Sequence, residues 1–169
     1  MNNLIITAVG SDHPGIVSEL SGVVSRHGAN VEESRMARLG SDFAILMLVT
    51  VPSDWQEALE LSLQSISGLT ITTKGTDSFT LEEMNISHLH LEGADNEGIV
   101  NVLSKFLAKK SINITELDTH ISHAPVSGTP LFNLNASLLV PEKVNRNRLL
   151  DELAEIAHAL GVEIQLNVF

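Results

Sequence analysis

The stretch GSDHPGIV at residues 10–17 returns as GADNEGIV at residues 93–100, and this repeat determines how the chain folds. Gly15 then aligns with Gly98, an offset of 83 residues that persists through the next segment of each copy. The dipeptide Val-Pro recurs later at an offset of 89, so the second copy carries six additional residues. A repeat of this length indicates a duplicated folding unit rather than the short repeat of a solenoid.

The duplication predicts two domains, at residues 1–81 and 82–169, joined by a polar segment at residues 76–83. Each half is near the size at which a single hydrophobic core is only marginally stable alone. We therefore expect the halves to pack against each other or against another subunit, and the chain to form homo-oligomers.

Hydrophobic periodicity predicts the same order of elements in both halves: strand, helix, strand, strand, helix, strand. In the first half we expect Pro14 in the first helical turn and Gly28 just beyond the last one. Ser53 is expected to cap the second helix, with Gln56 completing a capping box. The resulting fold class is α+β, with two tandem ferredoxin-like units that each place both helices on one face of an antiparallel sheet.

The composition excludes several classes of protein. Ten basic and 21 acidic residues give a net charge of −11, and the basic residues are dispersed along the sequence, so direct nucleic-acid binding is not expected. The chain has no cysteine, which excludes disulfides and thiolate metal sites. No segment approaches the roughly 18 apolar residues of a membrane span, and residues 1–6 predict a strand rather than a signal peptide. A cytoplasmic protein without membrane contact or cofactor is expected.

The loop at residues 10–15 and the helix and strand after it resemble a known family. Residues 12–17 read DHPGIV after a strand, and residues 28–31 read GANV at the entry to the next strand. This pattern resembles the ACT domain, a small regulatory module that typically binds amino acids. The second half is similar but carries Asn96-Glu97 and Ser111-Ile112 at the corresponding places. Two tandem ACT-like units without a catalytic domain resemble the glycine cleavage system transcriptional repressor family.

The chemistry of the loop also favours an amino-acid ligand. The loop leads into a helix N-terminus, where unpaired N–H groups and the helix dipole attract a carboxylate. Gly15 permits close approach of a ligand, Asp12 can pair with an ammonium group, and Asn30 can both donate and accept. The expected ligand-binding residues are Asp12, His13, Gly15, Ile16 and Asn30, with Asp95, Asn96, Gly98, Ile99 and Asn113 in the second half.

Structural explanations exist for the same residues. Asp12 and Asp95 are also consistent with helix capping, and the glycines with turn geometry alone. The pair Asp12-His13 lacks the surrounding signature of a catalytic site. Four histidines cluster in the second half: His88, His90, His120 and His123. The pair His88 and His90 has the spacing of some metal sites, but both should lie on the sheet face opposite Leu89 and Leu91. An interface or a solvated surface fits those histidines better than a metal site.

Together these features predict a non-enzymatic, amino-acid-responsive regulatory protein. The resemblance implies glycine as the ligand, a DNA-binding transcriptional activator as the protein partner, and repression of glycine cleavage genes without direct DNA binding. The alternative is a regulatory subunit that binds and tunes an enzyme of amino-acid metabolism. The protein that co-purifies with the chain distinguishes the two functions.

Overall fold

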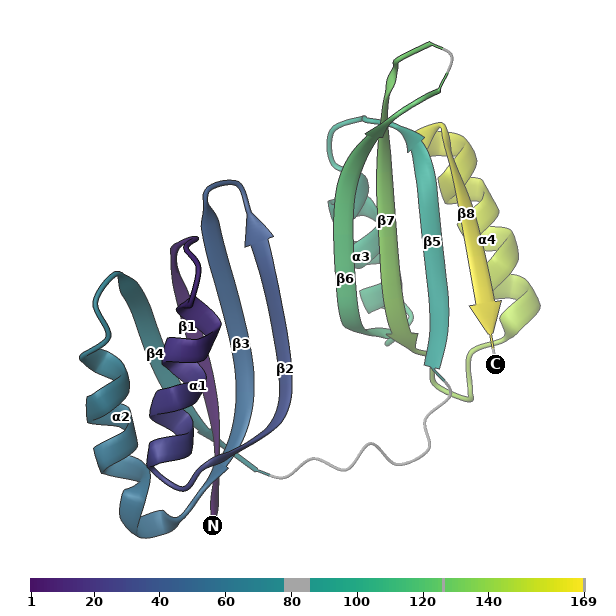
Figure 1. Ribbon diagram of the computed structural model, residues 1–169. Helices are drawn as coiled ribbons and strands as arrows, with labels where there is room; N and C mark the ends of the chain where they lie inside the picture. Colours follow the sequence, from purple (N-terminus) through teal and green to yellow (C-terminus); the bar gives the residue numbers. More distant parts are fainter. Residues whose placement is uncertain (78–85, 126, 169) are drawn as a thin grey trace. The chain divides into compact units, whose positions relative to one another are not determined.

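The computed structural model describes residues 1–77, 86–125 and 127–168, and the chain divides into two compact units (Figure 1). Unit 1 is Met1–Thr80 and unit 2 is Leu81–Phe169. The domain boundary expected after residue 81 lies outside the described residues.

Unit 1 contains, in chain order, β1 (Asn2–Ser11), α1 (Ile16–Arg26), β2 (Asn30–Leu39), β3 (Asp42–Val51), a 3₁₀ helix (Ser53–Trp55), α2 (Gln56–Gln64) and β4 (Leu69–Thr76). The strands form one sheet in the order β2-β3-β1-β4, and every neighbouring pair is antiparallel.

Unit 2 contains β5 (Ile86–Ala94), α3 (Ile99–Lys109), β6 (Asn113–His123), β7 (Pro130–Leu139), α4 (Arg146–Leu160) and β8 (Val162–Val168). Its sheet order, β6-β7-β5-β8, is that of unit 1, again with antiparallel neighbours. The expected tandem ferredoxin-like fold is confirmed.

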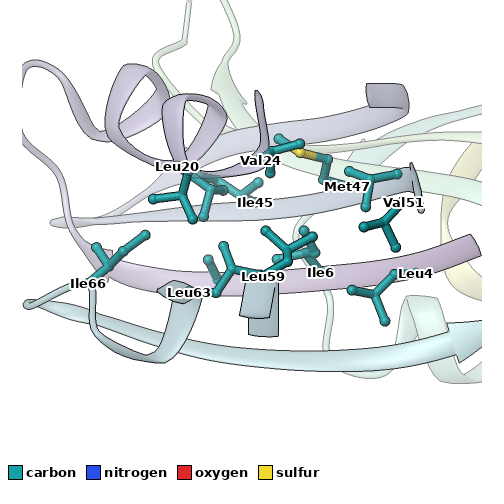
Figure 2. Packing of buried hydrophobic residues seen from close by; sticks show 13 residues of the cluster. Leu4, Ile6, Leu20, Val24, Ile45, Met47, Val51, Leu59, Leu63 and Ile66 are labelled. Carbon is teal, nitrogen blue, oxygen red and sulfur yellow. The ribbon is translucent and has the colours of Figure 1, made fainter. Parts of the chain in front are cut away.

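Alternating side chains of the central strand build the core of unit 1. Leu4 and Ile6 of β1 are completely buried on the helix-covered face of the sheet. They pack with Leu20 of α1 and with Leu59 and Leu63 of α2, as Figure 2 shows. The core of unit 2 is likewise built from Leu and Ile side chains of β5, α3 and α4, although Ser87 stands at the position of Leu4.

The duplication extends to an irregularity in the sheet. The register of β2 against β3 shifts between Val31 and Glu33, and that of β6 against β7 shifts between Ile114 and Glu116. Both bulges lie at the same offset of 83 residues that aligns the two loops. A bulge inserts an unpaired residue and redirects the side chains next to it.

Two expected helix starts differ from the structure. Helix α1 begins at Ile16 with Gly15 as its N-cap, so Pro14 lies in the turn before the helix and not in its first turn. Ser53 begins a 3₁₀ helix instead of capping α2, and its hydroxyl donates to Asn2 Oδ1 at 3.2 Å. The capping box is therefore not formed, because the Ser53 hydroxyl is used in a contact with β1.

In each unit, the first helix is followed by a residue in the left-handed conformation. This residue is Gly28 in unit 1 (φ +65°) and Ser111 in unit 2 (φ +58°). We expect Ser111→Gly to raise the free energy of unfolding of unit 2 by about 0.5–1 kcal/mol, since a side chain is strained in this conformation. Gly28→Ser should lower that of unit 1 by a similar amount. Calorimetry of the full chain measures both changes, and a loss of stability in Ser111→Gly would contradict the argument.

Candidate functional site

Backbone hydrogen bonds shape the loop between β1 and α1. The N–H of Asp12 donates to the carbonyl of Ser41 at 3.0 Å, and that of Ile16 donates to the carbonyl of His13 at 3.4 Å. Gly15 has a φ of +100°, and no side chain caps the helix that it begins. The first turn of α1 therefore presents its N–H groups without a side-chain acceptor, as an anion site requires.

The side chains of Asp12 and His13 point to separate partners. The Asp12 carboxylate lies 3.6 Å from Nε of Arg38 and is 34% exposed, so it is a surface ion pair and does not cap α1. His13 donates from Nδ1 to the carbonyl of Pro14 at 3.2 Å, since a carbonyl oxygen can only accept. This hydrogen bond turns the imidazole toward the backbone and gives no support to a catalytic Asp-His pair.

The corresponding loop of unit 2 has the same backbone and different side-chain contacts. Gly98 is the N-cap of α3 with a φ of +83°, again without a side-chain cap. Asn96 donates from its side-chain amide to the carbonyl of Leu160 at 3.0 Å, which ties this loop to the last residue of α4. Asp95 is exposed and does not cap α3. Asn96 thus anchors the second loop to α4, and the equivalent residue of the first loop is His13.

Two of the expected site residues have buried side chains. Ile16 and Ile99 are the first residues of α1 and α3, and both side chains are buried in the structure. Burial of these side chains fixes the position of each helix N-terminus. Their side chains are not available to a ligand at the loop.

The structure does not bring Asn30 or Asn113 to these loops. Asn30 pairs with Thr50, which pairs with Asn3, whereas the loop follows Ser11 at the other end of β1. Eight residues of extended strand separate the two ends by roughly 25 Å. Asn113 likewise pairs with Leu139 beside Ile86, at the far end of β5 from its loop. Asn30 and Asp12 of one unit are therefore too far apart to contact the same small amino acid.

Asn30 belongs instead to a polar cluster at the bulge of β2. Its amide donates to Glu32 Oε1 at 3.0 Å, and the Thr50 hydroxyl donates to the same oxygen at 2.8 Å. These bonds, the one from Thr50 first, hold the pKa of the Glu32 carboxyl below its ordinary value. Sequence reasoning missed Glu32 because its contact with Thr50 depends on how β2 pairs with β3. In unit 2 the corresponding residue is Thr115, which donates to the carbonyl of Ser137 at 3.1 Å.

The histidines of β5 lie on the outer face of the second sheet, opposite the face that buries Leu89 and Leu91, as expected. Nδ1 of His90 lies 2.9 Å from Oδ1 of Asn135, and Nδ1 of His88 lies 3.3 Å from the Ser137 hydroxyl. Among the described residues, no group of three or more His, Asp or Glu side chains is placed to hold a metal ion. No helix within the described ranges is long and apolar enough to cross a membrane.

Comparison with known proteins shows the family. An ACT domain model matches residues 2–74. The glycine cleavage system transcriptional repressor of Escherichia coli is 49% identical over 47 residues, which are 28% of this chain and 25% of that protein. The match thus spans a quarter of the length of that relative. A UPF0237 protein of Methanococcus maripaludis is 36% identical over 69 residues, covering 39% of this chain and 76% of the relative.

Two crystal structures match nearly the whole chain. An unknown protein from Galdieria sulphuraria has 34% sequence identity and a TM-score of 0.83, with 99% of this chain and 98% of that chain covered. A protein assigned as a glycine cleavage system transcriptional repressor has 26% identity and a TM-score of 0.69, with 99% and 97% covered. The chain therefore belongs to the ACT-domain family, as a tandem pair of ferredoxin-like units that resembles the glycine cleavage system transcriptional repressors.

Proposed function

We propose that the chain is a non-enzymatic regulatory protein that binds a small amino acid, with glycine as the first candidate. The ACT domain match and the similarity to glycine cleavage system transcriptional repressors support a regulatory role. The observation that carries the proposal is the pair of helix N-termini at Gly15 and Gly98. In both units a left-handed glycine begins the helix and no side chain occupies the first-turn N–H groups.

Each part of an amino acid has a complementary group at the first loop. The ligand carboxylate would accept from the first-turn N–H groups of α1, where the helix dipole also favours negative charge. The ligand ammonium group would pair with Asp12, whose carboxylate is partly exposed. Gly15 has no neighbouring atom within 4 Å of the place where a Cβ would lie, so a ligand can approach the backbone there.

The two loops are proposed to differ in affinity. The first carries the Asp12 carboxylate beside Arg38 and an exposed imidazole at His13. In the second, the Asn96 side chain is already bonded to the carbonyl of Leu160. We assign the stronger site to unit 1 and leave Asn30 and Asn113 outside both sites, because the sheet register places them at the opposite end.

The proposed output is a change in affinity for a protein partner. Binding of glycine would favour one population of the chain, and the partner would bind that population with a different affinity. The similarity to transcriptional repressors favours a DNA-binding activator as the partner, so that the chain represses glycine cleavage genes through that protein. The acidic charge of −11 supports action through a protein and not through direct contact with DNA.

Thermal melts of the full chain with each standard amino acid test this function. At a ligand concentration of one hundred times Kd, the native state should gain about 2.7 kcal/mol. Asp12→Asn should weaken the affinity about tenfold, because it removes one charged hydrogen bond. Asp54→Asn removes an exposed carboxylate from the same unit outside the loop and serves as the control. An unchanged melt with every amino acid, or equal affinity in Asp12→Asn, would contradict the proposal.

A further inference from the structure

Unit 2 contains a cavity of about 450 Å³ between the end of α3 and the start of α4. Four of the ten Lys and Arg residues of the chain line it: Lys109, Lys110, Lys143 and Arg148. Four basic residues from two separate segments of the sequence thus gather in space at one place. In a chain with a net charge of −11, such a concentration of positive charge needs an explanation.

One carboxylate, Glu152 of α4, holds two of the four basic side chains in place. It forms ion pairs with Lys110 and, at 3.0 Å, with Nε of Arg148. Lys110 also lies 5.7 Å from the centre of the Phe106 ring. The hydrogen bond from Lys110, followed by that from Arg148, lowers the pKa of the Glu152 carboxyl. An ionised Glu152 therefore orients two cations while offsetting only one positive charge.

The other two basic side chains have no carboxylate partner in the part of the chain that the structure describes. Lys109 is at the end of α3 and Lys143 precedes α4, and both are exposed. Side chains of Val144 and Leu149 contribute an apolar part of the lining, with Leu149 buried. The lining thus combines a net positive charge with a defined hollow.

The first unit provides an internal comparison. His27 occupies the position that Lys110 has in unit 2, at the offset of 83, and Trp55 is the N-cap of α2 as Asn145 is of α4. There the rings of His27 and Trp55 form a T-shaped pair, with centroids 6.0 Å apart and an angle of 73° between the ring planes. Nε2 of His27 also lies 3.1 Å from the Ser62 hydroxyl. At this place unit 1 has an aromatic pair, whereas unit 2 has a cavity lined by cationic side chains.

We propose that this basic pocket binds the phosphate group of a small molecule, independently of the amino-acid loops. Lysine ammonium groups and an arginine fork are the side chains that hold phosphate oxygens in proteins. Two lysines without a carboxylate partner suit the double charge of a phosphate better than the single charge of a carboxylate. The α4 dipole, whose positive end lies at Asn145, adds to the same preference. A volume of about 450 Å³ also leaves space for the molecule that carries the phosphate.

Backbone amide NMR of the full chain at constant ionic strength tests the pocket, with inorganic phosphate and O-phosphoserine as probes. Saturable shifts are expected at residues 109–111 and 143–149. The double variant Lys109→Gln/Lys143→Gln should bind either probe at least about tenfold more weakly, because two charged hydrogen bonds are lost. Lys105→Gln, which removes an exposed charge of α3 outside the pocket, should bind as the unaltered chain does.

Each outcome has a defined meaning. Equal affinity for both probes supports a site for free phosphate, and tighter binding of O-phosphoserine supports a phosphorylated metabolite. Both lysines are exposed, so the amide spectrum of the double variant should show the native fold away from the pocket. Absent or unsaturable shifts, shifts spread over basic residues of unit 1 such as Lys74, or equal weakening by Lys105→Gln would overturn the proposal.

Discussion

Gly10→Ala is expected to destabilise unit 1 by about 3 kcal/mol, because the new methyl group has no space to occupy. Gly10 lies in β1 between Phe43 of β3 and Leu69 of β4. A Cβ there would lie 2.1 Å from the carbonyl oxygen of Gly68 and 2.7 Å from a Leu69 methyl carbon. The carbonyl belongs to the backbone, so relief requires β4 to move away from β1.

Gly75→Ala is the matched control for this substitution. Gly75 lies in β4 of the same sheet, and a Cβ there would have no neighbouring atom within 4 Å. The free energy of unfolding of Gly75→Ala should stay within about 1 kcal/mol of that of the unaltered chain. Urea unfolding followed by the fluorescence of Trp55, the single tryptophan and a residue of unit 1, measures both variants. Equal stability of the two variants would show that β1 and β4 do not approach as closely as described.

Leu63→Ala is expected to cost unit 1 about 3 to 4 kcal/mol, through lost burial and the cavity left behind. Leu63 is completely buried in α2 and packs in the core shown in Figure 2. Small domains are stable by only about 5–15 kcal/mol. The variant should therefore bring unit 1 close to unfolding at ordinary temperature.

Leu61→Ala removes the same atoms from the same helix and provides the control. Leu61 is 62% exposed, and its replacement should change the free energy of unfolding by no more than about 0.5 kcal/mol. Trp55 fluorescence in urea again reports unit 1. A loss in Leu63→Ala no larger than that in Leu61→Ala would contradict the described packing of α2 on the sheet.

The repeat made the fold predictable from the sequence. Aligning Gly15 with Gly98 places each later element of one half on its counterpart, and the alternation of Leu4, Ile6 and Ala8 identifies the buried face of β1. The same offset also aligns the bulges of the two sheets, although their position cannot be deduced from hydrophobic periodicity. Local patterns determine elements and faces because those depend on residues that are close in sequence.

The site was less predictable because it depends on register. Helix α1 has 11 residues and returns the chain by about 16 Å, so the strand after it must begin at the far end of the sheet. This order of elements already separates Asn30 from Asp12, but the resemblance to the ACT domain led us to place both residues in one ligand-binding site. The contact of Glu32 with Thr50 depends on the register of β2 against β3 and was not accessible to sequence reasoning.

The basic pocket of unit 2 was also not predictable, since the two segments that line it, residues 109–111 and 143–149, lie more than thirty positions apart along the chain. Only the packing of α3 beside α4 brings Lys109 and Lys143 to one cavity. The difference between the basic pocket and the aromatic pair of unit 1 depends on which residue becomes the N-cap of the second helix in each unit. The sequence suggested Ser53 there, and the structure has Trp55.

A titration of the full chain with glycine, followed by amide NMR, is the sharpest test of the proposed amino-acid site. We expect saturable shifts at the first-turn amides of α1, residues 15–18, with weaker or absent shifts at residues 98–101. Asp12→Asn should reduce the affinity while Asp54→Asn leaves it unchanged. Saturable shifts confined to other parts of the chain, such as the cluster at Asn30, or no shifts at any glycine concentration, would contradict a glycine site at this loop.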